Sequence, residues 1–184
     1  IREQMQQEEE KLARVAARLK QIEQESKMSD YDVVIKKVDD LRIASLREVI
    51  PTYPEQGHLW EELESALTEK QIKPNGPCLT LYHSDEPEID AEVCEPVAEK
   101  NLAGDKTRIT VRELAGTEVA ALIHRGPYAT LSTAYEAFMK WIEENGYQIN
   151  GGPYREIYLK PPTEEGNQQD NESLTELQFP VKKD

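Results

Sequence analysis

A short alternating run near the C-terminal end of the sequence could bind a cation. In Tyr154–Leu159 the side chains of Tyr154, Glu156 and Tyr158 share one face of an extended strand, because successive side chains point to opposite faces. A carboxylate between aromatic rings attracts a cationic ligand by its charge and through the ring quadrupoles. The same pattern suits a solvated strand residue paired with a Lys or Arg. The residues alone leave both possibilities open.

The other face of this run is apolar and indicates how the strand packs. Ile157 and Leu159 alternate with the Tyr-Glu-Tyr face, and Leu79 and Leu81 form a similar pair earlier in the sequence. We expect the Ile157/Leu159 face to pack beneath helices and Glu156 to face away from that layer. If the Glu156 carboxylate is desolvated, its affinity for a proton rises, and a cationic ligand then competes with protonation.

The remaining reactive residues form no pattern that indicates a metal site or a catalytic centre. His58, His83 and His124 are dispersed, and Cys78 and Cys94 lack the spacing of metal ligands. We find no nucleophile–base pair and no phosphate-binding loop, so the sequence predicts no metal and no cofactor. Two cysteines without a disulfide framework suit a reducing compartment, and we expect a cytoplasmic protein.

The charge balance argues against one class of partner. With 22 Lys and Arg against 36 Asp and Glu, the 184-residue chain has a net charge of −14. A surface that binds nucleic acid needs clustered basic residues, so we expect no DNA contact from this chain itself. An acidic surface favours solubility first and the attraction of cations second.

The beginning of the sequence has no apolar segment of the kind that targets or anchors a protein. It opens at Ile1, without a Met, on a stretch rich in Gln and Glu. We therefore expect no signal peptide, no transmembrane span and no membrane contact, and we interpret the chain as a fragment or a processed product.

Residues 1–27 are predicted to form a coiled-coil helix that dimerises the protein. The stretch Ile1–Ser26 contains neither Gly nor Pro, and its apolar residues recur at heptad spacing, with one lapse at Glu8. The seam consists of Ile1, Met5, Leu12, Val15, Leu19 and Ile22. So narrow a stripe favours a partner helix and a homodimer, although packing of the helix on its own domain is the alternative.

Residues 31–184 are predicted to form one domain from two similar halves, residues 31–100 and 106–182. Each half has two strands, one amphipathic helix and two further strands. In the first half these are Tyr31–Val38, Leu41–Ile50, Gln56–Lys70, Cys78–His83 and Ile89–Val97. In the second half they are Lys106–Leu114, Glu118–Arg125, Ala129–Asn145, Tyr154–Leu159 and Ser173–Val181.

Landmark residues return in the same order in both halves and indicate an internal duplication. The pairs are Pro51 with Pro127, Pro74–Pro77 with Asn150–Pro153, Tyr82 with Tyr158, and Glu92 with Glu176. One helix per half covers only one face of a sheet, so the halves must share a sheet or leave surface exposed. We expect an α+β fold of duplicated β-β-α-β-β units with a mainly antiparallel sheet and two helices. The junction of the halves is a natural binding groove.

Several motifs of the second half resemble the GyrI-like effector-binding domain. They are His124–Tyr128 (HRGPY), Asn145–Tyr147 (NGY), Gly152–Leu159 (GPYREIYL) and Thr175–Val181 (TELQFPV). The resemblance covers residues 31–181 and implies the GyrI-like, SHS2-type fold. That domain is found alone and in AraC-type and MerR-type regulators.

The heptad helix upstream is similar to the MerR-type arrangement, in which a winged-helix DNA reader precedes an antiparallel coiled coil. No winged helix stands in this sequence. The resemblance therefore implies that DNA is contacted only through a domain missing from this chain.

The resemblance also implies a pocket for a drug or metabolite. In multidrug-sensing relatives, a glutamate on the strand after the second helix lies at the pocket base and meets cationic, aromatic ligands. Glu156 holds that position in this sequence, between Tyr154 and Tyr158. Glu176 matches a second acidic position that some relatives have.

Three more aromatic residues are weaker candidates for the pocket. Tyr128 follows the Gly126-Pro127 break and suits either the pocket rim or the start of a helix. Trp60 and Trp141 each lie beside the apolar stripe of a helix. Core packing is the default for both, with a pocket wall as the functional alternative.

Two other functions stay open beside ligand sensing in a MerR-type regulator. Some GyrI-like domains hydrolyse reactive cyclopropane-bearing compounds; there Glu156 would activate water and Tyr128 or Trp141 would orient the substrate. A bare protein-interaction module, similar to the small gyrase-binding members, is the third possibility. The heptad helix favours signalling, because a hydrolase has no need of a rod that leads to another domain.

Overall fold

The structure is a computed structural model that describes residues 11–23, 31–102, 108–162 and 171–183. The elements of the first half are β1 (Val33–Val38), β2 (Leu41–Ile50), η1 (Tyr53–Gln56), α2 (Gly57–Glu69), β3 (Leu79–Ser84) and β4 (Ile89–Pro96). Those of the second half are β5 (Thr110–Leu114), β6 (Thr117–Arg125), η2 (Tyr128–Thr130), α3 (Leu131–Glu144), β7 (Tyr147–Ile149), β8 (Tyr154–Lys160) and β9 (Leu174–Lys183). The expected α+β class and element order are confirmed, with β7 as an additional short strand.

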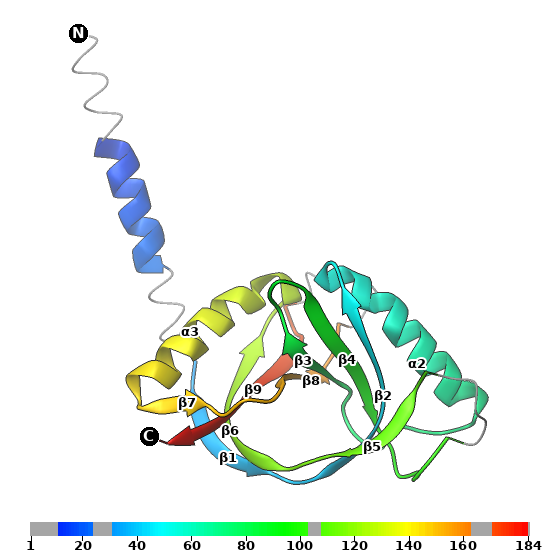
Figure 1. Ribbon diagram of the computed structural model, residues 1–184. Coiled ribbons are helices and arrows are strands. Elements are labelled where there is room, and N and C mark those ends of the chain that lie inside the picture. The colour runs from blue at the N-terminus through cyan, green and yellow to red at the C-terminus, as the bar shows by residue number, and fades with distance from the viewer. Residues whose placement is uncertain (1–10, 24–30, 103–107, 163–170, 184) are drawn as a thin grey trace.

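The strands form one curled sheet in which every pairing is antiparallel (Figure 1). Eight strands follow in the order β1-β6-β9-β8-β3-β4-β2-β5, and β7 pairs with β9. The first strand of each half has left its own half, because β1 pairs with β6 and β5 pairs with β2. Exchanging the two halves reproduces the same order, with β3 and β8 at the centre, which is the symmetry that the predicted duplication requires.

The exchanged strands bring the turns of the two halves into contact. The backbone N–H of Gly116, between β5 and β6, donates a hydrogen bond of 2.6 Å to Oδ1 of Asp40, between β1 and β2. A Cβ atom at position 116 would collide with the carbonyl oxygen of Val38. A glycine is therefore needed where the two halves cross.

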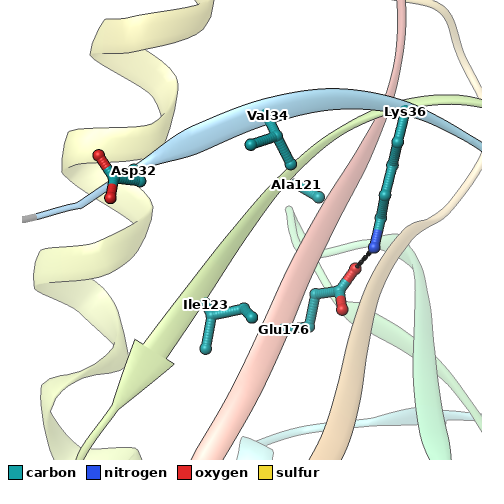
Figure 2. A pocket seen from close by; sticks show the side chains of 6 residues that line it. All are labelled: Asp32, Val34, Lys36, Ala121, Ile123 and Glu176. Carbon is teal, nitrogen blue, oxygen red and sulfur yellow. Dashed lines mark ion pairs between the residues drawn. The ribbon is translucent and has the colours of Figure 1, made fainter.

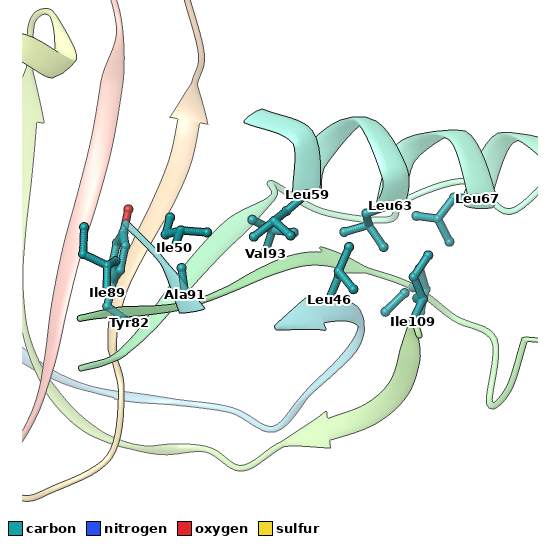
Figure 3. Packing of buried hydrophobic residues seen from close by; sticks show 12 residues of the cluster. Leu46, Ile50, Leu59, Leu63, Leu67, Tyr82, Ile89, Ala91, Val93 and Ile109 are labelled. Carbon is teal, nitrogen blue, oxygen red and sulfur yellow. The ribbon is translucent and has the colours of Figure 1, made fainter. Parts of the chain in front are cut away.

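Both long helices lie over the same side of the curled sheet, with β3 and β8 between them (Figure 1). The apolar residues of α2 recur every fourth position, so Leu59, Leu63 and Leu67 pack as one stripe against Leu46 and Val93 (Figure 3). In the second half, Phe138 and Ile142 of α3 pack against β6 and β9 in a separate cluster. The central strands thus lie between two helix-covered cores.

The opposite side of the sheet has its own apolar cluster. Leu79 and Leu81 of β3 and Ile157 of β8 belong to it, together with Ile43 and Cys94. The expectation that the Ile157 face packs beneath the helices is wrong, because no residue of α2 or α3 is in this cluster. Glu156, on the other face of β8, points toward the helices instead.

Residues 11–23 are helical, as the heptad pattern predicts for this part of the stretch. Their apolar side chains are exposed to between 48% and 68%, at Leu12, Val15, Leu19 and Ile22. The other two seam residues, Ile1 and Met5, lie outside the described residues. Dimerisation through this helix stays a prediction. None of the helices in the described ranges has the length and apolar character needed to cross a membrane.

Candidate ligand-binding site

Glu156 lies in the middle of β8, on the central strand pair and beneath the helix layer. Its neighbour across the pair is Thr80 of β3. Only 7% of its surface is exposed. The central strands place this carboxylate at the junction of the two halves, where the sequence predicts a binding groove.

Two tyrosines hold the Glu156 carboxylate. The hydroxyl of Tyr135, on α3, donates to Oε1 at 2.6 Å, and the hydroxyl of Tyr158 is 2.9 Å from Oε2. Burial raises the pKa of Glu156 above its ordinary value, and the two hydrogen bonds lower it by less. In the described part of the chain, no Lys, Arg or His forms an ion pair with Glu156.

The hydrogen-bond network continues from Tyr158 into the first half. The Tyr158 hydroxyl is 3.0 Å from Oγ1 of Thr80, which in turn is 3.2 Å from Oε1 of Gln56. The Gln56 amide nitrogen donates to the Tyr82 hydroxyl at 3.2 Å. Both halves therefore contribute polar side chains to the surroundings of Glu156.

Aromatic rings surround this network. Tyr154 stacks on Tyr82 with ring centroids 5.0 Å apart, and on Phe179 at 5.2 Å. Tyr158 is flanked by Trp60 of α2 at 6.1 Å and by Tyr128 at 5.7 Å. A ligand that displaced one of these rings would contact the faces and edges of the remaining rings.

The structure brings four of the six predicted site residues together. Tyr154, Tyr158 and Tyr128 share the neighbourhood of Glu156, as the network and ring contacts show. Trp141 stacks instead on Tyr147, with ring centroids 5.8 Å apart. It is six residues farther along α3 than Tyr135, or about 9 Å by the helix rise.

Glu176 lies on the opposite face of the sheet from Glu156. It is paired with Ile157 in the β8–β9 register, whereas Glu156 is paired with Leu177. Its carboxylate forms an ion pair of 2.5 Å with Lys36 and accepts a hydrogen bond from Gln178 at 2.6 Å. The pair borders an open hollow of about 340 Å³ that Val34, Ala121 and Ile123 also line. Figure 2 shows these side chains and the ion pair.

A second buried carboxylate, Glu92, lies on the same outer face and is fully paired. Arg112 binds both of its oxygens, at 2.7–3.0 Å, and His83 approaches Oε2 to 2.7 Å. Burial raises the pKa of Glu92, but the hydrogen bonds from His83, Arg112 and Ser45 outweigh it and lower the pKa to about 2. Glu92 is therefore a structural anion, unlike Glu156.

The sequence did not single out Tyr135, Thr80 and Gln56, and it treated Trp60 as a core residue by default. The signal for Thr80 was present, because Tyr82 and Tyr158 are landmark equivalents and Thr80 stands two residues before Tyr82, as Glu156 does before Tyr158. Tyr135 had no signal of its own beyond its place in the predicted helix Ala129–Asn145. No group of three or more His, Cys, Asp or Glu in the described residues could hold a metal ion.

A family model and several solved structures are similar to this chain. A family model described as "GyrI-like small molecule binding domain" matches residues 31–182. A cryo-EM structure of the EcmrR–DNA complex in EcmrR-RPo is 27% identical, with a TM-score of 0.72, over 100% of this chain and 70% of that chain. A crystal structure of the EcmrR C-terminal domain is also 27% identical, with a TM-score of 0.73, over 84% of this chain and 99% of that chain.

Two more distant structures share the fold. SAV2435 bound to tetraphenylphosphonium is 16% identical, with a TM-score of 0.57, over 82% of this chain and 94% of that chain. A hydrolase from Listeria innocua is 14% identical, with a TM-score of 0.58, over 82% of this chain and 92% of that chain. No curated protein matches the sequence.

Proposed function

Because the chain belongs to the family of GyrI-like small molecule binding domains, we propose that it senses a cationic or aromatic drug or metabolite as part of a bacterial MerR-type transcription regulator. The site is the region around Glu156, between α2 and α3. The observation that carries this proposal is a buried carboxylate with phenol partners and no ion pair among the described residues.

A buried glutamate without a cationic partner costs stability whenever it is ionised, and a neutral residue would avoid that cost. A ligand cation inserted among the rings would provide the missing charge and replace ring–ring contacts by cation–π contacts. Glu92 makes the contrast, because the fold gives that carboxylate an Arg and a His.

Entry of a ligand requires some of the rings to move, since Glu156 is only 7% exposed. Trp60 and Tyr128 are partly exposed rings near the starts of the two helices, and both contact Tyr158. Their displacement would open a path between the helices. SAV2435, whose structure holds tetraphenylphosphonium, has the same fold and suggests that cation as the first probe.

The regulator part of the proposal is supported by the likeness to EcmrR in its DNA complex over the whole length of this chain. The helix over residues 11–23, with its exposed apolar stripe, would join two copies and transmit the bound state. The net charge of −14 disfavours DNA contact by this chain, so we assign that contact to a separate domain. Because a bacterial transcription regulator acts on DNA in the cytoplasm, we assign the protein to that compartment.

Calorimetric titration tests the proposal with two ligands of similar size, tetraphenylphosphonium and neutral triphenylphosphine oxide. At about pH 8, Glu156→Gln should weaken cation binding by roughly tenfold to a hundredfold, or about 1–3 kcal/mol, and leave the neutral ligand unaffected. Glu176→Gln is the matched control on the opposite face and should change neither affinity. Equal losses for both ligands, or a loss in the control alone, would contradict the assignment.

Hydrolysis is the second candidate function, and it is favoured by the shared fold with the Listeria innocua hydrolase and by a buried glutamate that can act as a general base. Incubation with an electrophilic cyclopropane compound separates the two functions. Turnover by the wild type, lost in Glu156→Gln while binding persists, would establish the enzyme.

A further inference from the structure

Three oxygen-to-oxygen contacts in a row connect Glu156 to Gln56. They join Glu156 Oε2 to Tyr158, Tyr158 to Thr80, and Thr80 to Gln56 Oε1. Each contact needs one hydrogen between its two oxygens. The three contacts together therefore need three hydrogens.

The hydroxyl groups that take part in these contacts supply only two of the three hydrogens. Tyr158 and Thr80 have one each, and the Gln56 carbonyl oxygen has none. The Gln56 amide group cannot help, because its nitrogen faces the Tyr82 hydroxyl. With the Gln56 amide in this orientation the third hydrogen comes from Glu156, which then donates to Tyr158 as a carboxylic acid, whereas Tyr158 is the donor when Glu156 is ionised.

When Glu156 is ionised, every hydrogen bond in this series has its donor and acceptor exchanged. Half a turn of the Gln56 amide would bring its nitrogen to Thr80 and its oxygen to Tyr82. Thr80 would then donate to Tyr158, and Tyr158 to Glu156. The orientation of Gln56 and the proton on Glu156 are thereby linked through Thr80.

We propose that Gln56 and Thr80 are positioning residues that hold Glu156 in its protonated form in the ligand-free domain, so that a cation binds with release of that proton. This inference rests on the proposed function and adds to it a rule for ligand choice. Neutral ligands bind without exchanging a proton, whereas cations bind more tightly as the pH rises.

Within the described ranges, the polar groups that face Glu156 from the neighbouring elements are neutral. They are Tyr135 on α3, Tyr158 and Tyr154 on β8, Thr80 and Tyr82 on β3, Tyr128 on η2, and Tyr53 with Gln56 on η1. Burial raises the pKa values of Tyr135 and Tyr158 well above the ordinary range, so both keep their hydrogens. Burial also raises the pKa of Glu156, in the direction that the hydrogen count requires.

Titration with tetraphenylphosphonium measures the proton release, because this cation has no proton of its own to exchange. Calorimetry in two buffers of different ionisation enthalpy gives the number of protons released per cation bound. We expect about one at the acid end of a series from about pH 5 to about pH 8, with affinity rising roughly tenfold per pH unit there. The release should fall toward zero once the pH exceeds the pKa of Glu156.

Two variants break the link and one variant controls for the loss of a hydroxyl. Thr80→Val removes the Thr80 hydroxyl, so Tyr158 can donate its hydrogen only to Glu156. Gln56→Met removes the acceptor of the Thr80 hydrogen, so Thr80 donates to Tyr158 instead. Both variants should favour the ionised form of Glu156, and the pH dependence of proton release and of cation affinity should move to lower pH. Thr175→Val is the control, because Thr175 is a buried threonine of β9 whose hydroxyl has no hydrogen-bond partner among the described residues.

Carbon-13 NMR of the Glu156 carboxyl group tests the same link without a ligand. The carboxyl should titrate at a higher pH in the wild type and in Thr175→Val than in Thr80→Val and Gln56→Met. Identical midpoints in all four proteins would overturn the inference. If tetraphenylphosphonium fails to bind while the NMR midpoints separate, the proposed function fails and the control of the Glu156 charge stands.

Discussion

Thr80 and Glu156 face each other across the central strand pair and occupy equivalent positions of the two halves. Each stands two residues before its landmark tyrosine, Tyr82 or Tyr158, and the β3–β8 register pairs them directly. Two identical halves would place the same residue at both positions, and two glutamates there would repel strongly because like charges at adjacent buried positions do. With threonine on one side, the site has a single carboxylate and a hydroxyl next to it.

The stability of the ligand-free domain should depend on the Glu156 proton. Its folded-state pKa is raised, so the folded protein keeps this proton where the unfolded chain has lost it. The free energy of unfolding should therefore fall as the pH rises from about 4.5 to the raised pKa, by at most about 1.4 kcal/mol per pH unit, and then level off. Urea unfolding of wild type and Glu156→Gln over this range gives the difference. A constant difference would mean that Glu156 is ionised throughout.

Glu92 should respond to pH in the opposite sense. Its pKa is lowered to about 2, so its stabilising contribution is present above about pH 4.5 and is lost as the pH falls toward 2. Arg112→Met should cost about 2 kcal/mol near neutral pH and reduce the acid-dependent loss, because one partner of a buried carboxylate is gone. Arg47→Met, which removes the more exposed pair with Asp90, should cost less than about 1 kcal/mol. Equal costs would show that burial of Glu92 is unimportant.

Tryptophan fluorescence should identify which indole borders the ligand. Trp60 lies against Tyr158, whereas Trp141 lies against Tyr147. Tetraphenylphosphonium should change the fluorescence of the wild type and of Trp141→Phe, and the change should vanish in Trp60→Phe. The reverse pattern would restore Trp141 as the ligand-binding residue that the sequence suggested.

The N-terminal helix should hold two copies together. Replacing Leu12 and Leu19 by Asp would bury charge in the seam of a short coiled coil, which such a coil does not tolerate. Sedimentation of the double variant should show a monomer, and its circular dichroism should show a folded α+β domain. A dimer of unchanged strength would place the interface elsewhere.

The element order could be predicted from local patterns, because alternation and fourfold spacing reflect burial on one face of a strand or helix. Leu59, Leu63 and Leu67, spaced by four residues in the predicted helix Gln56–Lys70, form a stripe that the structure buries. β7 could not be predicted in this way, since three residues are too few for a pattern and the strand exists through its pairing with β9. The exchange of β1 and β5 was equally hidden, because strand partners depend on contacts far apart in the sequence.

For the site, the sequence predicted which side chains share a strand face but assigned the wrong surroundings to that face. Tyr154, Glu156 and Tyr158 do share a side, and it is the side beneath the helices. Apolar residues line both faces of β8, so alternation alone could not decide which face is covered by helices. Glu176 was predicted from its match to an acidic position of some relatives, and its register with Ile157 places it on the face opposite Glu156.

The exchange of first strands means that neither half could complete its sheet alone. Two separate copies of such a half would pair through their β3-type strands and by trading β1-type strands, which is the arrangement of a domain-swapped dimer. When the two halves belong to one chain, equivalent positions of the halves can carry different residues. The pseudo-twofold axis passes between Thr80 and Glu156. Two identical halves would place identical side chains on either side of this axis, whereas the single chain combines a hydroxyl group with a carboxyl group there.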